Sequence, residues 1–160
     1  MSTKSQLPMA LRAAYLALHR RSDAQFAAHG VTADQFVLLA TLARGQALTQ
    51  RELAVRMSSD PSTVRAMLVL LEQRGYVKRE THPTDARART VALSAAGKRK
   101  FKQLWTAGDA IRLQMAEALS ADEAQILVGL LSRIGSVLSQ SAEGELEAVT
   151  GAVAGAKIES

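Results

Sequence analysis

The stretch from Leu48 to Val77, LTQRELAVRMSSDPSTVRAMLVLLEQRGYV, constrains the fold of this chain more than any other part of its sequence. Thr49 and Glu52 have the spacing of a capping box, in which each side chain accepts a hydrogen bond from the backbone N–H of the other residue. Asp60, with a proline directly after it, is typical of a second helix start. Gly75 is placed to end that helix. The stretch therefore predicts two short helices separated by a tight turn.

Two helices are predicted upstream of this stretch. Apolar side chains recur at three- and four-residue spacing over residues 7–29, Pro8 suits a first helical turn, and Gly30 is a natural stop. Thr32 and Gln35 form another capping-box pattern and begin the next helix. Amphipathic helices of this kind are stable only when their apolar face is covered, so both need packing partners.

A hairpin and two long helices are predicted downstream. The segments Tyr76–Thr81 and Thr90–Leu93 flank the polar loop HPTDARAR, which favours two short antiparallel strands. Ser94 begins one long helix, and a capping-box pair at Ser120 starts a final apolar helix after a bend. Residues 141–160 are rich in Ala, Gly, Ser and Glu without a firm apolar stripe, and we expect a mostly disordered tail there.

Composition limits the class of protein. With 48% hydrophobic and only 4% aromatic residues, the 160-residue chain can bury a core that is mainly aliphatic. The absence of cysteine excludes disulfides, thiol redox sensing and thiolate metal sites within the chain. No apolar run approaches the roughly 20 residues that span a bilayer, and Arg12 interrupts the N-terminal apolar patch in the manner of an amphipathic helix rather than a secretory signal. We therefore expect a cytoplasmic protein without a membrane partner.

Positive charge is concentrated on the predicted hairpin and on the helix start beside it. The formal net charge of the chain is +5, and its sequence pI is about 10.0. Between residues 74 and 102 only Glu80 and Asp85 accompany nine cations, a local charge of +7: Arg74, Lys78, Arg79, Arg87, Arg89, Lys98, Arg99, Lys100 and Lys102. A solvated charge run is the simpler explanation, but its coincidence with a hairpin favours a polyanionic partner.

The order of elements predicts a winged helix-turn-helix, which is a mainly α fold with a small β-hairpin wing (α+β), together with a helical dimerisation domain. The small Ala54 and the apolar Val64 occupy the positions at which the two helices of such a motif approach and lock, while Ser58 stands where many such motifs have glycine. The N-terminal part of the second helix enters the major groove in such motifs. An arginine there can also be merely solvated. We expect contacts to base edges and phosphates from Ser62, Thr63, Arg65 and Ala66.

These features together resemble the MarR (multiple-antibiotic-resistance regulator) family of bacterial transcription factors. The resemblance covers roughly residues 10–140, and its most specific part is a wing signature, Asp85-Ala86-Arg87 followed by Leu93-Ser94-Ala95-Ala96-Gly97. It implies that Asp85 braces the wing arginine, that Arg87 enters the minor groove and that Arg89 supports it from the strand. A narrow minor groove does attract an inserted guanidinium. Arg51 and Lys98 complete the expected set of DNA contacts.

The resemblance also implies a homodimer that binds double-stranded DNA at a pseudo-palindromic operator. Residues 7–31 and 98–140 would form the helical dimerisation region, and residues 32–97 the DNA-binding domain. The apolar end helices agree with this, because a single copy offers them too few partners. The prediction is a transcriptional regulator that acts as a repressor.

Members of this family commonly release DNA when a small aromatic or anionic molecule binds between the two regions. The family's cysteine-oxidation mode cannot operate here, since the chain has no cysteine. Simpler roles exist for every candidate contact, because Phe36 and Leu39 suit a core and the charged candidates suit surface or interdomain ion pairs. By position, the candidates are Tyr15, His19, Arg20, Phe36, Leu39 and Arg112.

Catalysis, metals and cofactors are not expected. His19, His29 and His82 lack the spacing of metal ligands, and Ser58 and Ser59 lie outside any nucleophile-elbow pattern. Two alternatives to a ligand-responsive repressor share the predicted fold. One is a constitutive or architectural DNA-binding protein without a ligand, and the other is a winged-helix module that contacts proteins.

Overall fold

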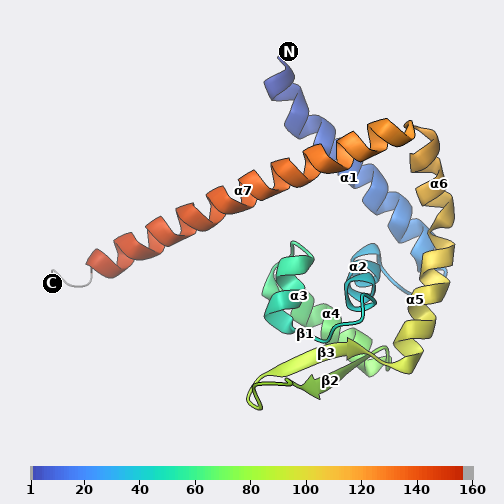
Figure 1. Cartoon of the computed structure of the whole chain (residues 1–160), viewed down its shortest axis with the longest axis vertical. Helices are drawn as coiled ribbons and strands as arrows, with labels where there is room; N and C mark the ends of the chain where they lie inside the picture. The colour runs from blue at the N-terminus through green and yellow to red at the C-terminus, as the bar shows by residue number, and fades with distance from the viewer. Residues whose placement is uncertain (1, 157–160) are drawn as a thin grey trace. The chain divides into compact units, whose positions relative to one another are not determined.

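The computed structural model describes residues 2–156 and confirms a mainly helical fold with a small antiparallel sheet (Figure 1). Packing groups the chain up to Arg112 in one compact unit and the chain from Leu113 in a second. This grouping does not test the predicted division into dimerisation and DNA-binding regions, which stays a prediction. The elements in chain order are α1 (Thr3–Ala27), α2 (Ala33–Leu42), β1 (Leu48–Thr49), α3 (Gln50–Arg56), α4 (Pro61–Gln73), β2 (Val77–Thr81), β3 (Arg89–Leu93), α5 (Ala95–Ala107), α6 (Asp109–Glu117) and α7 (Ala121–Ala156).

Reciprocal side-chain caps begin α2 and α3 at the predicted positions. Thr32 Oγ1 accepts a hydrogen bond from the Gln35 N–H at 3.1 Å, and the Gln35 side chain accepts one from the Thr32 N–H at 3.1 Å. Thr49 and Glu52 form the same pair of bonds at 3.1 and 2.8 Å. Each cap satisfies backbone donors that a helix start leaves unpaired, so these boundaries are set by residues that are close in sequence.

Left-handed backbone conformations end two helices and shape the turn between α3 and α4. Gly30 and Gly75 have φ angles of 69° and 77°, which confirms them as helix stops. Ser58, in the turn of the helix-turn-helix, has a φ of 51° and is the one non-glycine residue with positive φ within residues 2–156. A serine thus adopts the conformation that glycine favours, at a cost of about 1 kcal/mol.

The sheet has three strands in the order β1-β3-β2. β2 and β3 pair antiparallel with Val77 opposite Leu93, which confirms the predicted hairpin. β1 pairs with β3 through Leu48 opposite Val91. The sequence did not predict β1, because a strand of two residues has no periodicity of its own and is defined only by its tertiary partner.

Aliphatic side chains from helices and sheet form the core of the first unit. α2, α3 and α4 pack on one another and on the sheet, and α5 packs against α2 and β3 (Figure 1). Ala54 and Val64 are 2% and 0% exposed, as expected where α3 and α4 approach. Full burial of a leucine or valine side chain contributes about 1.5–3 kcal/mol, so this core fixes α4 relative to the hairpin. The fully buried side chains include Leu38, Leu39, Leu53, Leu68, Leu71, Val91 and Leu104.

Two helix boundaries in the first unit differ from the prediction. α1 begins at Thr3 rather than at residue 7, so Pro8 lies inside the helix instead of in its first turn. A proline this close to a helix start removes one backbone hydrogen bond and leaves the later turns intact. The single helix predicted from Ser94 is divided at Gly108 into α5 and α6. Glycine is the poorest helix former after proline, which favours a break at this position.

α7 makes up most of the second unit. Ser120 Oγ accepts a hydrogen bond from the Glu123 N–H, and the Glu123 carboxylate accepts one from the Ser120 N–H, both at 3.1 Å, which confirms the predicted helix start. α7 continues to Ala156, whereas we predicted a mostly disordered tail over residues 141–160, of which 157–160 lie outside the described residues. Alanine and glutamate favour helix even where no apolar stripe marks it. Each helix described here is too short or too polar to cross a membrane.

Candidate nucleic-acid interface

α4 has one buried face and one exposed polar face. Val64, Met67, Leu68 and Leu71 are buried along its length. The spacing of three and four residues places Ser62, Arg65 and Ala66 together on the exposed face. This face can therefore enter a groove without disturbing the core. The predicted contact residues on the helix pair, all of them exposed, are Arg51, Ser62, Thr63, Arg65 and Ala66.

The carboxylate of Asp60 organises the N-terminal tip of α4. It accepts hydrogen bonds from Ser62 Oγ at 2.6 Å, from Thr63 Oγ1 at 2.7 Å and from the Thr63 N–H at 2.9 Å. These bonds, the one from Ser62 first, hold the pKa of Asp60 well below its usual range. Both hydroxyl groups donate their hydrogen bond to the ionised carboxylate, so the Ser62 and Thr63 oxygens can only accept hydrogen bonds from a ligand. Their expected contacts to phosphates and base edges stay a prediction, in which the two oxygens would act as hydrogen-bond acceptors.

At the level of sequence, Asp60 was interpreted only as a helix cap and was not included in the candidate interface. The signal was available in the order Asp-Pro-Ser-Thr, which places two hydroxyl side chains within reach of one carboxylate. Local bonding of this type is characteristic of Asp, Ser and Thr at helix starts.

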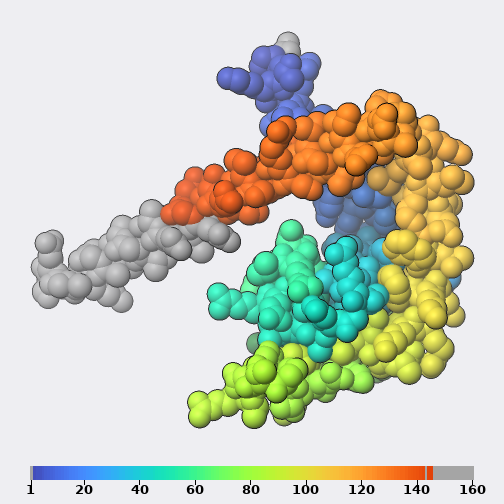
Figure 2. Space-filling view, in the orientation of Figure 1, coloured from blue at the N-terminus to red at the C-terminus, as the bar shows by residue number. Residues whose placement is uncertain are grey.

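Backbone hydrogen bonds close the tip of the hairpin. The His82 N–H donates to the Ala88 carbonyl at 3.0 Å, and the Asp85 carboxylate accepts from the Arg87 N–H at 3.0 Å. The predicted bracing by Asp85 thus acts on the backbone of Arg87, and within residues 2–156 no ion pair joins their side chains. Arg87 and Arg89 are exposed. Figure 2 shows the hairpin, in yellow-green, projecting beyond the helices of its unit.

Neighbouring carboxylates neutralise part of the basic region. Arg79 Nε lies 3.2 Å from a Glu72 oxygen on α4, and Lys78 Nζ lies 3.0 Å from a Glu80 oxygen on the same strand. The local charge of +7 already counts Glu80, and Glu72, which lies outside residues 74–102, lowers the charge that a polyanion meets to +6. The cations of the predicted contact set that take part in no ion pair of the described chain are Arg51, Arg65, Arg87, Arg89 and Lys98.

A close backbone approach anchors α5 to the start of β2. The Ser94 N–H donates to the Tyr76 carbonyl at 3.1 Å, and Ser94 Oγ accepts from the Gly97 N–H at 3.0 Å. A Cβ at Gly97 would lie 1.9 Å from the Tyr76 carbonyl oxygen, so only glycine fits there. Lys98 follows directly and lies at the end of the sheet remote from the hairpin tip, because β3 runs from the tip towards α5 (Figure 1). The structure therefore separates Lys98 from Arg87.

Two of the predicted ligand contacts belong to the core. Leu39 is 0% exposed. The Phe36 ring is stacked between Phe26 and Phe101, with centroid distances of 4.6 and 6.1 Å. One edge of Phe36 also borders a hollow of about 350 Å³ between α2 and α3. Neither side chain is free to move towards a ligand without loss of packing.

The polar ligand candidates have separate partners. His19 Nε2 lies 3.2 Å from Asp23, and its ring centroid lies 5.6 Å from that of Tyr15. The Arg112 guanidinium lies 3.8 Å from the centroid of the Trp105 ring and donates to Asp109. The remaining candidate, Arg20, is exposed on α1. The hollow beside α2 and α3 is lined by one of the six candidates, Phe36. Metal-binding clusters of three or more His, Asp or Glu are absent from the part of the chain that the structure describes.

The structural order of these elements agrees with a sequence comparison. The family model described as "MarR family" matches residues 29–88, from the turn before α2 to the hairpin loop. Over these residues the chain is similar to the MarR family, and a solved structure of MarR from E. coli shares its fold. The MarR-family proteins that resemble it are transcriptional regulators and not enzymes.

Curated relatives cover most of the chain at modest identity. A protein of Thauera aromatica, named for regulation of the hcr operon, is 30% identical over 105 residues, which cover 66% of this chain. The match spans 63% of that protein, so this chain covers less than two thirds of that relative's length. The HTH-type transcriptional repressor MdtR of Bacillus subtilis is 28% identical over 119 residues, 74% of this chain and 77% of that protein.

Two solved structures with the MarR fold contain DNA. A mutant MarR of E. coli complexed with operator DNA matches with a TM-score of 0.72 and 25% identity, over 81% of this chain and 93% of that one. The transcriptional repressor CouR, bound to a 23-mer DNA duplex, matches with a TM-score of 0.73 and 25% identity, over 81% and 92% of the two chains.

Proposed function

We propose that this chain is a sequence-specific DNA-binding transcriptional repressor of the MarR family that acts as a homodimer. The observation that carries the proposal is the presence, in one compact unit, of an exposed α4 tip with Arg65 and of a projecting hairpin with Arg87. In double-stranded DNA, α4 would enter the major groove and the hairpin would lie along the adjacent minor groove. The DNA-bound relatives of the same fold support this arrangement.

Each proposed contact has its own chemistry. Arg65 would donate two hydrogen bonds to O6 and N7 of a guanine, which discriminates against other bases by about 1–3 kcal/mol. Ser62 and Thr63, whose hydroxyl protons are donated to Asp60, would accept from the amino group of cytosine or adenine. Arg87 would respond to the width of the minor groove rather than to base identity. Sequence would therefore be read by α4, and DNA shape by the hairpin.

Exposed apolar side chains on the terminal helices support the homodimer. α1 buries only Phe26, while Leu7, Met9 and Tyr15 are 47%, 63% and 57% exposed. Apolar stripes on long helices need a partner, and a second copy would provide one by two-fold symmetry. A pseudo-palindromic operator with half-sites about one helical turn apart follows from that symmetry. Among the α7 side chains that the structure describes, the large apolar ones that are at least 40% exposed are Ile126, Leu127, Val128, Leu130, Leu131, Val137 and Leu138.

Release from DNA by a small aromatic or phenolic effector is proposed from the family resemblance. Leu39 and Phe36 are held in the core and Arg112 is held by Asp109, so they do not form a ready site in one copy. A panel of phenolic acids, tested for their effect on operator binding and on thermal melting, checks this part of the proposal. A flat response across the panel would leave a constitutive DNA-binding protein as the function.

The DNA-binding proposal is tested with the double variant Arg65→Ala, Arg87→Ala. Selection of bound duplexes from a random pool first provides the operator. We expect the variant to lose roughly 30-fold or more in operator affinity, since each arginine contact is worth about 1–3 kcal/mol and the two would lie in different grooves. The matched control is Arg44→Ala, Arg56→Ala, which removes the same charge from exposed positions outside both the predicted DNA contacts and the predicted dimerisation region.

The result that contradicts the docking is an unchanged affinity of the Arg65, Arg87 double variant. Equal losses in both double variants would mean that total charge, and not these two contacts, determines binding. If the unmodified chain selects no duplex at all, the fold serves protein contacts instead of DNA.

A further inference from the structure

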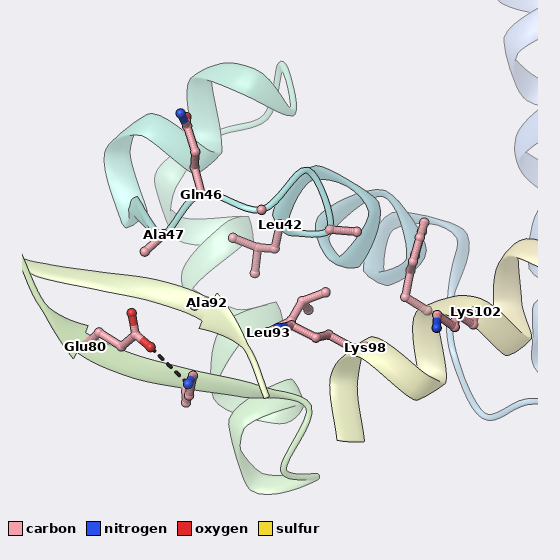
Figure 3. Close-up of a pocket in the computed structure, with 12 residues that line it drawn as sticks. Leu42, Gln46, Ala47, Glu80, Ala92, Leu93, Lys98 and Lys102 are labelled. Carbon is pink, nitrogen blue, oxygen red and sulfur yellow. Dashed lines mark ion pairs between the residues drawn. The ribbon is translucent and has the colours of Figure 1, made fainter. Parts of the chain in front are cut away.

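A groove of about 480 Å³ lies between the end of α2, the sheet and the first turns of α5 (Figure 3). This volume is within the range of about 300–1,000 Å³ that is usual for small-molecule sites. Its apolar part is formed by Leu42, Ala92 and Phe101, and its cationic part by Lys78, Lys98 and Lys102. Figure 3 shows Lys98 and Lys102 reaching the groove from α5, and Ala92 and Glu80 from the two strands. The groove thus combines an apolar surface with several ammonium groups.

The register of the sheet places this groove away from α4. Lys78 lies opposite Ala92, so these two groove residues share one face of the sheet. Arg79 is one residue further along β2, points to the other face and pairs with Glu72 of α4 at 3.2 Å. The part of the groove formed by Lys78, Glu80 and Ala92 therefore lies on the sheet face opposite the helix proposed to enter DNA.

The charge of the groove is incompletely balanced. Lys78 is paired with Glu80 at 3.0 Å. Lys98 and Lys102 are four residues apart, on one face of α5, and take part in no ion pair of the described residues. Two ammonium groups beside an apolar surface therefore lack an anion. A ligand that supplies about two negative charges would balance the groove.

We propose that this groove binds a small organic anion in which a doubly charged head, of the phosphate-ester type, is joined to a flat apolar body. The head would lie between Lys98 and Lys102, since a phosphoryl group carries nearly two negative charges at neutral pH. The body would cover Leu42, Ala92 and the edge of Phe101. A DNA phosphate is the competing occupant, but its sugar and base would not cover this apolar surface on a face turned away from α4. The inference does not depend on the proposed function.

Phenyl phosphate is the probe, because it has both parts of the proposed ligand. Binding is followed by calorimetry and by the fluorescence of Trp105, the single tryptophan of the chain. The Trp105 ring centroid lies 5.9 Å from that of Phe101, so a ligand on Phe101 changes the environment of the reporter. Inorganic phosphate offers the head alone and benzyl alcohol the body alone. We expect saturable binding of phenyl phosphate that is at least about ten-fold tighter than that of either fragment.

The double variant Lys98→Gln, Lys102→Gln tests the site, and Lys100→Gln is the matched control. Lys100 is on the same helix but outside the groove, with its Nζ 5.8 Å from the centroid of the Tyr76 ring. We expect the double variant to lose at least about ten-fold in affinity for phenyl phosphate, as charge-assisted hydrogen bonds are lost, and the control to stay within about two-fold of the unmodified chain. Amide chemical shifts should change at Gly45, Ala92 and Lys98, which border the groove.

Several outcomes overturn the inference. Absence of saturable binding, or an equal loss in Lys100→Gln, shows that no specific site exists. Displacement of the probe by a random DNA duplex, together with a smaller salt dependence of DNA binding in the double variant only, assigns the two lysines to phosphate contacts instead. By contrast, a chain that fails to bind an operator but still binds phenyl phosphate saturably refutes the proposed function and supports the inference.

Discussion

Replacement of Gly97 by alanine tests the close approach between α5 and β2. The added Cβ would lie 1.9 Å from the Tyr76 carbonyl oxygen, 2.9 Å from the Tyr76 carbonyl carbon and 3.3 Å from Leu93 Cδ2. The two nearest atoms belong to the backbone, so no side chain can rotate to relieve the contact. The start of α5 must therefore move away from β2 by more than an ångström. Such a shift would also break the bond from the Ser94 N–H to the Tyr76 carbonyl.

The expected loss of stability follows from these contacts. Overpacking of this type costs about 1–3 kcal/mol, and each hydrogen bond lost costs about 1 kcal/mol. The Ser94 N–H and Ser94 Oγ both bond to carbonyls at this junction. Alanine offsets about 0.5–1 kcal/mol of this loss, because it is a better helix former than glycine. We expect Gly97→Ala to lower the free energy of unfolding by about 2–4 kcal/mol.

Urea denaturation measures this loss, with all variants at one protein concentration because a dimer gains stability with concentration. Gly144→Ala is the control, since a Cβ at Gly144 in α7 meets no atom within 4 Å, lies outside the predicted dimerisation region and should raise stability by about 0.5–1 kcal/mol. A Gly97→Ala protein that is as stable as the unmodified chain, beside a stabilised Gly144→Ala protein, would refute the reasoning. Operator affinity of Gly97→Ala then reports whether the junction also positions the hairpin.

Two further substitutions test the core and the α4 tip. Leu68→Ala removes a fully buried side chain from α4 and should lower the free energy of unfolding by about 2–5 kcal/mol in urea; a loss under 1 kcal/mol would mean that α4 does not pack as described. Asp60→Asn keeps a capping side chain but removes the carboxylate whose pKa is lowered by Ser62 and Thr63. A lowered folded-state pKa contributes stability that is present above the ordinary carboxyl pKa of about 4 and is lost as the pH falls below it. The urea midpoint of Asp60→Asn should therefore decline less on acidification, and parallel pH profiles for the two proteins would contradict this.

Local signals in the sequence were sufficient for most helix starts and for the hairpin. The bonds between Thr49 and Glu52 and between Ser120 and Glu123 join residues three positions apart, so their spacing alone predicts them. Gly75 is similar, because a left-handed helix end is a property of one residue. These features require no knowledge of the rest of the chain.

Features that depend on distant partners could not be predicted in the same way. The pair between Glu72 and Arg79 forms only after β2 turns back against α4, and β1 exists only through its bonds to β3. The groove beside Lys98 joins three segments that are remote in sequence. The role of candidate ligand contacts such as Leu39 could not be predicted either. The same aliphatic residue at the same helical spacing can contact a ligand or pack in a core, and the sequence does not distinguish the two.

The conformation of the hairpin tip does not depend on the charges of its arginine side chains. The Asp85 carboxylate accepts a hydrogen bond from the Arg87 N–H, and further backbone hydrogen bonds close the turn. The conformation of the loop therefore does not need the arginine charges. Added salt should therefore weaken the attraction of this loop to a polyanion while its conformation stays the same. The ionic strength of the surroundings could then set how long the protein stays on DNA, independently of any ligand.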